Sequence, residues 1–103
     1  MATFVSVAKT GDVPPGAVIE VQCDGQPVAL ANVNGEYLAI GGTCTHRGGP
    51  LGEGELDGET IVCPWHGGMF SVRTGDVEMG PPSKPVPAYR VLVEGDDIKI
   101  APA

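Results

Sequence analysis

Four potential metal ligands occur in two short motifs, and this arrangement constrains the chain more than any other feature. The first motif is Cys44-Thr45-His46 and the second is Cys63-Pro64-Trp65-His66, so each pairs one thiol with one imidazole. Sixteen residues separate His46 from Cys63, which is enough chain for a hairpin. Two thiolates on one iron and two imidazoles on the other suit a [2Fe–2S] cluster, which moves one electron at a time. The motifs therefore predict an electron carrier rather than an enzyme.

Structural zinc is the alternative use of two cysteines and two histidines. Zinc fingers usually group like residues, as Cys-x₂₋₄-Cys followed by His-x₃₋₅-His, whereas each motif of this chain combines the two types. Thiolates suit ferric iron and imidazole is intermediate in softness, so a mixed set is chemically reasonable for iron. The spacing favours an iron–sulfur cluster, although ligand type alone leaves zinc open.

Short apolar runs between turn residues predict an all-β, mostly antiparallel fold. The 16 glycines and 10 prolines approach the level of disordered chains, but 42% hydrophobic residues in alternating runs argue against disorder. No segment keeps a helical period, and residues 9–16 allow at most one helical turn. The predicted strands are residues 3–7, 18–22, 28–33, 36–40, 60–62, 69–72, 86–94 and 98–101. The predicted turns are Asp24-Gly25, Asn34-Gly35, Asp57-Gly58, Thr74-Gly75 and residues 94–97.

The length of 103 residues predicts a single domain with a small core. Both ligand motifs fall within about residues 41–83, where glycines and acids are dense. We interpret this part as a cluster-binding insertion. The flanking residues, about 1–40 and 84–103, are expected to form a β-stranded base.

The charge of the chain predicts which partners it avoids. Thirteen acids against six bases give a formal net charge of −7, which disfavours nucleic acid and suits basic patches on partner proteins.

No apolar run is long enough to span a bilayer, and no signal peptide is recognisable, so we expect no membrane contact. Three cysteines, two of them used as ligands, do not form a disulfide framework, and a cytoplasmic location is expected.

The two motifs and the residues after them closely resemble Rieske-type ferredoxins, the soluble carriers of bacterial aromatic-ring dioxygenase systems. The resemblance rests on residues 44–51 and 63–70, with Thr74-Gly75 and Gly80-Pro81-Pro82 behind them. It implies a Rieske fold of three antiparallel sheets, with the cluster-binding subdomain inserted at one end of the base. It further implies electrons arriving from a flavoprotein NAD(P)H reductase and leaving to a terminal oxygenase.

The same resemblance implies one Rieske-type [2Fe–2S] cluster per chain. Cys44 and Cys63 would hold the inner iron, while His46 and His66 would hold the outer iron through Nδ1, with their tips near solvent. A mononuclear oxygenase site needs two further histidines and a carboxylate, and this chain has two histidines in all. The chain is therefore expected to serve an oxygenase and not to be one.

Departures from the respiratory branch of the superfamily predict a low reduction potential. That branch has an extra cysteine in each ligand loop, where this chain has Gly49 and Trp65, so the corresponding disulfide is absent. It also has a serine and a tyrosine that donate hydrogen bonds to cluster sulfurs, where this chain has Gly68 and Phe70. Fewer donors stabilise the reduced cluster less, which predicts a potential near the lower end of the Rieske span of about −150 to +300 mV.

Two other functions stay open from the sequence. One is a Rieske-like small subunit of another reductase, such as nitrite reductase, although many of those lack the ligands. The other is a metal-stabilised structural or sensing module that carries no electrons. Rapid reduction by a reductase would separate a carrier from such a module.

Residues around the motifs receive predicted supporting roles. Four glycines follow the ligands, namely Gly48, Gly49, Gly67 and Gly68. Without a Cβ, their N–H groups can approach the sulfides closely. Leu51 is expected to pack over the cluster, and Pro81-Pro82 to form a stiff wall on its remaining side. Trp65 would shield the cluster or contact a partner, and shielding is favoured.

The remaining polar and thiol residues near the motifs have less specific roles. Arg47 is expected to be exposed. A contact with a partner protein and an ion pair with a local acid are equally favoured alternatives for its side chain. Cys23 is interpreted as a spare thiol with no ligand role. Four acids recur at every second position, namely Glu53, Glu55, Asp57 and Glu59. A solvated hairpin edge is favoured for them, with a docking surface as the alternative and no catalytic role.

Overall fold

The computed structural model describes residues 4–45, 48–65, 67–80 and 84–102, and strands dominate these parts of the chain. Ten strands form, and the two short helical elements among the described residues are single 3₁₀ turns at Thr10–Asp12 and Leu51–Glu53. The first of these confirms the helical turn expected within residues 9–16. Within the described parts, no helix is long and apolar enough to cross a membrane.

Six strands form the larger sheet, which we call the base sheet. Its spatial order is β1-β10-β9-β4-β3-β2, and its pairings are antiparallel. The strands are β1 (Val5–Lys9), β2 (Val18–Cys23), β3 (Gln26–Val33), β4 (Glu36–Gly41), β9 (Ala88–Glu94) and β10 (Asp97–Pro102). The halves β2-β3-β4 and β1-β10-β9 are joined through β4 and β9 at two residue pairs, Ala39–Tyr89 and Ile40–Ala88.

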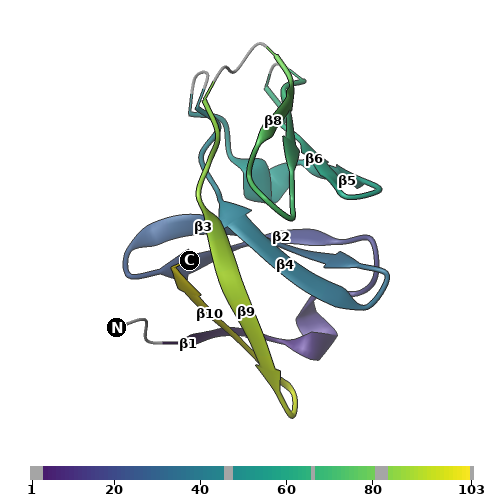
Figure 1. Cartoon of the computed structure of the whole chain (residues 1–103). Helices are drawn as coiled ribbons and strands as arrows, with labels where there is room; N and C mark the ends of the chain where they lie inside the picture. Colours follow the sequence, from purple (N-terminus) through teal and green to yellow (C-terminus); the bar gives the residue numbers. More distant parts are fainter. Residues whose placement is uncertain (1–3, 46–47, 66, 81–83, 103) are drawn as a thin grey trace.

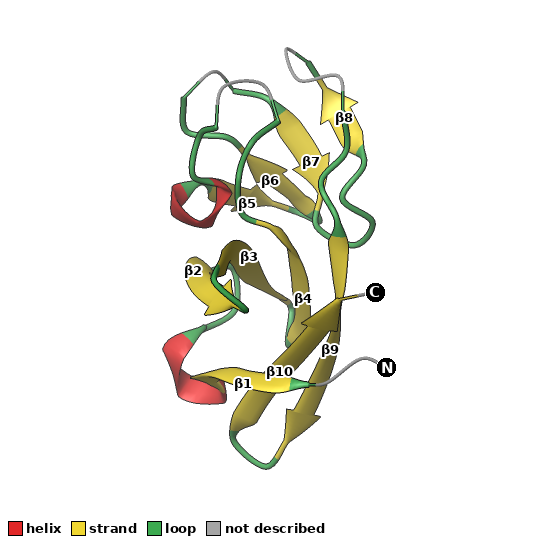
Figure 2. Cartoon of the chain, turned by 90° about the vertical axis from the view of Figure 1, so that its left-hand side faces the viewer, coloured by secondary structure: helices red, strands yellow, loops and turns green. Residues whose placement is uncertain are grey.

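Four three-residue strands form the second sheet, which we call the upper sheet. They are β5 (Glu55–Asp57), β6 (Thr60–Val62), β7 (Met69–Ser71) and β8 (Val77–Met79), antiparallel and in sequence order. Figures 1 and 2 show this sheet lying over one side of the base sheet, with the 3₁₀ turn at Leu51–Glu53 between them. The three antiparallel sets implied by the family resemblance are thus the two halves of the base sheet and the upper sheet.

Tight turns connect the hairpins where the sequence predicts them. Asp24 and Asn34 have φ values of 51° and 52°, and the glycines that follow them also have positive φ. Such values at both central residues match the right-handed twist of the flanking strands, and Asn, Asp and Gly tolerate them. The β2–β3 and β3–β4 hairpins therefore have the register that these turns specify.

Strand β3 divides the interior into two apolar cores. Its side chains alternate, so that Val28 and Leu30 face a core inside the base sheet, with Ile98 and Ile100 of β10. Ala29 and Ala31 face the opposite way, into the core between the base and upper sheets. Both faces of β3 are buried as a result, and the second core is the one that contains Cys44 and Cys63.

The sequence missed two strands, β5 and β8, and placed others a few residues off. Strand β1 starts at Val5 where residue 3 was predicted, and β9 starts at Ala88 where residue 86 was predicted. The missed strands lie at the two edges of the upper sheet, and each is only three residues long. Leu56 is the single apolar residue in β5, so this strand has no alternation to detect.

Candidate metal centre

Two loops with the same framework carry the predicted ligands. Residues 44–49 form the first loop, and an antiparallel bridge between Thr43 and Pro50 closes its base. Residues 63–68 form the second loop, which the pair Val62–Met69 closes in the same way. Strand β4 leads into the first loop, whereas β6 and β7 flank the second. Each loop is thus anchored by paired backbone on both sides.

The backbone hydrogen bonds of the two loops match one another. In the first loop, the N–H of Cys44 donates to the carbonyl of Gly49 at 2.8 Å, and the N–H of Gly48 donates to the carbonyl of Cys44 at 2.9 Å. In the second, the N–H of Cys63 donates to the Gly68 carbonyl at 2.7 Å, and the Gly67 N–H donates to the Cys63 carbonyl at 3.1 Å. Both loops thus present a cysteine at the same point of the same turn.

Each turn depends on a glycine in the left-handed region. Gly48 has φ of 76° and Gly67 has φ of 74°, values that other residues rarely adopt. The expectation that the N–H groups of the glycines after the ligands approach the sulfides stays a prediction; those of Gly48 and Gly67 donate to the carbonyls of Cys44 and Cys63. Each of these glycines lies four residues after its cysteine, a shared spacing that the different Cys–His separations of the two motifs hide.

The two loops place their thiols in one buried apolar cluster. Cys44 is 3% exposed and Cys63 is 2% exposed, and both belong to the core between the sheets. They form no disulfide with each other or with Cys23. A Cβ placed on Gly49 of the first loop would lie 2.7 Å from the Sγ of Cys63 in the second. The loops therefore face each other across a gap that only a glycine leaves open.

These features fit a thiolate-ligated metal centre. Two sulfur donors from separate loops lie in the same core, and the missing side chain at Gly49 leaves space beside one of them. Leu51, Ile61 and Phe70 are fully buried around the thiols and exclude water from that side. Leu51 shares the core of the two thiols, and its expected packing over the cluster stays a prediction.

His46 and His66 lie outside the described residues, as do Arg47, Pro81 and Pro82. Their predicted roles therefore stay predictions. The neighbouring Thr45 and Pro64 are exposed, so the chain reaches solvent on both sides of the site. Thr45 donates from Oγ1 to the carbonyl of Lys84 at 2.6 Å, which ties the first loop to the segment before β9.

Trp65 differs from the expectation that it shields the site. Its side chain is 57% exposed, and its Cγ would lie 3.2 Å from a Cβ on Gly49. The ring therefore lies over the first loop at the surface instead of filling the core.

An open cleft lies beside the second loop. Its volume is about 380 Å³ and its lining includes Cys63, Pro64 and Gly67 together with two carboxylates, Glu53 and Glu55. Both glutamates are exposed, as is Asp57 at the end of β5. Of the four acids noted in the sequence, Glu55 and Asp57 lie on the edge strand β5, whereas Glu53 ends the 3₁₀ turn and Glu59 immediately precedes β6. Glu53 and Glu55 are the two that line the cleft.

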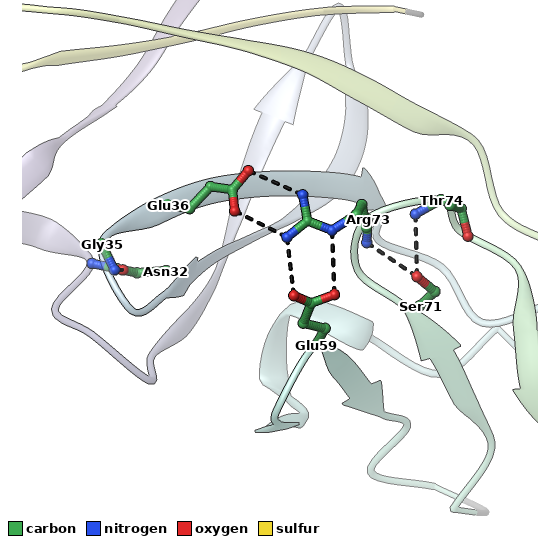
Figure 3. A network of polar contacts seen from close by, with 7 residues as sticks. All are labelled: Asn32, Gly35, Glu36, Glu59, Ser71, Arg73 and Thr74. Carbon is green, nitrogen blue, oxygen red and sulfur yellow. Dashed lines mark hydrogen bonds and ion pairs between the residues drawn. The ribbon is translucent and has the colours of Figure 1, made fainter.

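Sequence reasoning missed Arg73, which lies in the turn after β7. Its guanidinium forms ion pairs with Glu36 and Glu59, the acids nearest to it in Figure 3. Hydrogen bonds from Arg73 hold the pKa of both carboxyls below the usual range. These three residues are far apart in sequence, and nothing in their local spacing indicates that they meet.

Cys23 lies in the other core, inside the base sheet. Burial raises the pKa of its thiol, and the negative charge of Asp24 adds to the effect. A neutral thiol in an apolar core is a poor ligand and a poor nucleophile. The position agrees with the expectation of a thiol that takes no part in the candidate site.

Comparisons with known proteins point to one family. The Rieske [2Fe-2S] domain profile matches residues 3–90. The biphenyl dioxygenase ferredoxin subunit of Pseudomonas sp. (strain KKS102) is 41% identical over 99 residues, which cover 95% of this chain and 91% of that protein.

Solved structures extend the similarity to the fold. The ferredoxin of carbazole 1,9a-dioxygenase from Nocardioides aromaticivorans IC177 superposes with a TM-score of 0.92 at 36% identity, covering 98% of this chain and 99% of that one. A chain in the complex of reduced oxygenase and oxidized ferredoxin in carbazole 1,9a-dioxygenase gives 0.88 at 35% identity, covering 95% and 92%. With its two matched cysteine loops, this chain belongs to the Rieske [2Fe-2S] domain family.

Proposed function

We propose that this protein is a low-potential one-electron carrier for an aromatic ring-hydroxylating system. It takes electrons from a flavoprotein NAD(P)H reductase and delivers them to the terminal oxygenase. The observation that carries the proposal is the pair of matched loops, which bring Cys44 and Cys63 into one buried cluster. Two similar proteins that are ferredoxin components of biphenyl and carbazole dioxygenases support the same assignment.

The proposed ligands are Cys44 and Cys63 for one iron and His46 and His66 for the other, with one cluster per chain. A cluster of this type accepts and releases one electron without making or breaking substrate bonds. The chain's own residues bury the thiols and keep the inner side dry, while the adjacent Thr45 and Pro64 are exposed. We assign this centre to the insertion of about residues 41–83, held on the base formed by the rest of the chain.

The surroundings of the thiols support a low potential. Phe70 is fully buried in the same apolar cluster as both cysteines, and its ring offers no hydrogen-bond donor. Gly68 has no side chain at all, so neither residue supplies a side-chain donor that would stabilise extra negative charge at the sulfurs. We place the midpoint potential near the lower end of the Rieske span, which suits electrons that come from NAD(P)H.

The surface beside the second loop supports docking of a basic protein partner. Trp65 presents exposed aromatic area, and Glu53 and Glu55 add negative charge at the cleft next to Cys63. A net charge of −7 favours fast encounter with a positively charged partner and disfavours nucleic acid. The cytoplasmic location expected from the sequence is part of this proposal.

The two rival functions have less support. A nitrite reductase small subunit is disfavoured because the similar proteins at 36% and 41% identity are ferredoxin components of dioxygenases. A structural or sensing module is disfavoured for the same reason. A reduction assay would distinguish it, because such a module would not be reduced rapidly by a reductase.

Single substitutions of the ligands test the assignment. His46→Ala, His66→Ala, Cys44→Ser and Cys63→Ser should each abolish the Rieske absorption and electron paramagnetic resonance spectra. Cys23→Ser is the matched control, because Cys23 is the third cysteine and lies in the other core. An unchanged spectrum in any ligand variant, or a lost spectrum in the control, would refute the ligand set.

A further inference from the structure

The guanidinium of Arg73 lies between two carboxylates and donates a pair of hydrogen bonds to each of them (Figure 3). Nη1 and Nη2 of Arg73 donate to the two carboxylate oxygens of Glu36 at 3.0 and 2.9 Å. Nε and Nη2 donate to the two oxygens of Glu59 at 3.2 and 3.0 Å. Bidentate pairs of this kind fix the relative orientation of the groups as well as their separation. One side chain therefore sets the position of two others.

The two glutamates lie at the starts of the strands that lead to the ligand loops. Glu36 is the first residue of β4, which runs towards Cys44. Glu59 immediately precedes β6, which runs into Cys63. The N–H of Val72, next to Arg73, donates to the carbonyl of Glu59 at 2.8 Å and extends the β6–β7 pairing at the end away from the ligand loop. Arg73 thus joins the starts of the two strands that lead to the cysteines: β4 ends three residues before Cys44, and β6 ends directly before Cys63.

Both strands are hydrogen-bonded to a neighbouring strand on each side, which limits how far they can move on their own. Strand β4 is paired with β3 along its length and with β9 near its end, and β6 is paired with β5 and β7. The strands themselves belong to different sheets. Among the ion pairs that the structure gives for the described residues, Glu36–Arg73 is the one that joins the base sheet to the upper sheet.

From this geometry we infer that Arg73 is a positioning residue for the metal centre. By fixing the start of β4 against the start of β6, it holds the two cysteine loops at one relative position. The inference rests on the proposed ligand set and extends it to a residue that touches no ligand. Its ion pairs are exposed, with side-chain exposures of 43% for Arg73 and 55% for each glutamate. Its effect is therefore expected on local opening of the upper sheet more than on global unfolding.

The test measures how firmly the two loops hold the iron. Arg73→Gln should release iron to the chelator bathophenanthroline about fivefold faster than the wild type at low salt, since one modest interaction changes an opening equilibrium by about that factor. Added salt should speed release from the wild type towards the rate of the variant, because salt screens exposed charges. The electron paramagnetic resonance lines of Arg73→Gln should broaden, since loosely held loops give a spread of ligand geometries. Arg73→Lys keeps the positive charge but cannot form the paired hydrogen bonds of a guanidinium. Its iron release rate and line width should fall between those of the wild type and Arg73→Gln.

Lys99→Gln provides the matched control. It breaks another exposed ion pair, Lys99–Glu94 at 2.7 Å, which lies within the base sheet and joins β9 to β10. This variant should keep the wild-type release rate and line width. Should Arg73→Gln fail to fold, Glu36→Gln removes only the contact between the sheets and is expected to show the same faster release.

The outcomes separate this inference from the proposed function. Wild-type release rate and line width in both Arg73→Gln and Glu36→Gln would overturn the positioning role alone. Equally fast release from Lys99→Gln would also overturn it, because any lost ion pair would then suffice. A wild-type protein that binds zinc and shows no Rieske spectrum after iron reconstitution would instead overturn the proposed function, and this inference with it.

Discussion

Gly49 is where the two ligand loops come closest, and alanine there should disrupt the site. A Cβ would lie 2.7 Å from the Sγ of Cys63, closer than real contacts of this kind, so the thiol or the loop has to shift. We expect Gly49→Ala to lower the iron content sharply and to cost about 1–3 kcal/mol in the free energy of unfolding. The iron-to-protein ratio and the visible spectrum of the purified variant measure the first effect.

Gly11→Ala is the control for this substitution. A Cβ on Gly11 meets nothing within 4 Å, and its φ is not in the left-handed region. This variant should keep full iron content and near wild-type stability. Full iron content in Gly49→Ala would contradict the close approach of the two loops.

Substitution of Phe70 gives a second test at the scale of single residues, and its readout is the midpoint reduction potential of the cluster. Phe70→Tyr places a hydroxyl in the apolar cluster that contains Cys44 and Cys63. Donation to a sulfur would stabilise the reduced state, so the midpoint potential should rise by some tens of millivolts. Phe4→Tyr changes the other phenylalanine, outside that cluster, and should leave the potential unchanged. A potential that is equal or lower in Phe70→Tyr would contradict the proposed role of missing donors.

The sequence predicted the identity of the candidate ligands better than their surroundings. Cys44 and Cys63 were found because metal chemistry requires a few residue types at short spacing. Their shared burial and the contact of Gly49 with the opposite loop depend on the tertiary fold, which local spacing does not specify. The exposure of the Trp65 side chain also depends on the tertiary fold, and its role as a shield or a partner contact stays a prediction.

At the scale of the structural elements, the ion pair between Glu36 of β4 and Arg73 of the β7–β8 turn should make the free energy of unfolding depend on pH. Arg73 holds the pKa of Glu36 below its ordinary value of 4.5, so ionised Glu36 favours the folded state. The stabilisation is present above about pH 4.5 and is lost as the pH falls through the lowered pKa. Glu36→Gln should therefore be less stable than the wild type at neutral pH, and the difference should shrink in acid.

Urea unfolding of both proteins at low salt, from neutral pH to about pH 3, measures this difference. High salt should reduce it at neutral pH, since both partners are exposed. A difference in unfolding free energy that stays constant across this range would contradict the contribution of the ion pair.

Prediction of the elements succeeded where the turn chemistry is explicit. Asn34-Gly35 and Asp24-Gly25 marked hairpins because few residues accept positive φ at both central positions. Strands β5 and β8 were missed because three-residue edge strands have too few apolar positions to show a period. The role of Arg73 was invisible, since it depends on contacts across 37 and 14 residues of chain.

For the whole molecule, the net charge of −7 predicts salt-dependent encounter with basic partners. The second-order rate constant for reduction by the reductase, followed by stopped-flow absorbance, should fall as ionic strength rises. The double variant Glu53→Gln/Glu55→Gln should lower the rate at low salt and weaken this dependence, because both acids flank the cleft next to Cys63.

Asp57→Asn is the control for these charges. Asp57 lies on the same strand β5 and is exposed, but it does not line the cleft. It removes one charge at a greater distance and should change the rate less than either Glu53→Gln or Glu55→Gln alone. An equal effect of all three acids would indicate that net charge alone, and not this surface, steers the encounter.

The arrangement of the whole chain was predictable in outline from the position of its motifs. The concentration of ligands and glycines predicts the insertion of about residues 41–83; β5 to β8 lie within these bounds, and the division into insertion and base stays a prediction. The division of the interior into two cores by β3 was not predictable, because its run of buried residues has no polar face. A run that is apolar on both faces does not specify which core each face joins.

A redox titration followed by electron paramagnetic resonance tests the central claim most directly. We predict a rhombic signal with an average g below the free-electron value, appearing on reduction near the lower end of the Rieske span of about −150 to +300 mV. A clearly positive midpoint potential would contradict a carrier fed from NAD(P)H. The absence of any signal, with zinc in the protein and no recovery after iron reconstitution, would contradict the cluster itself.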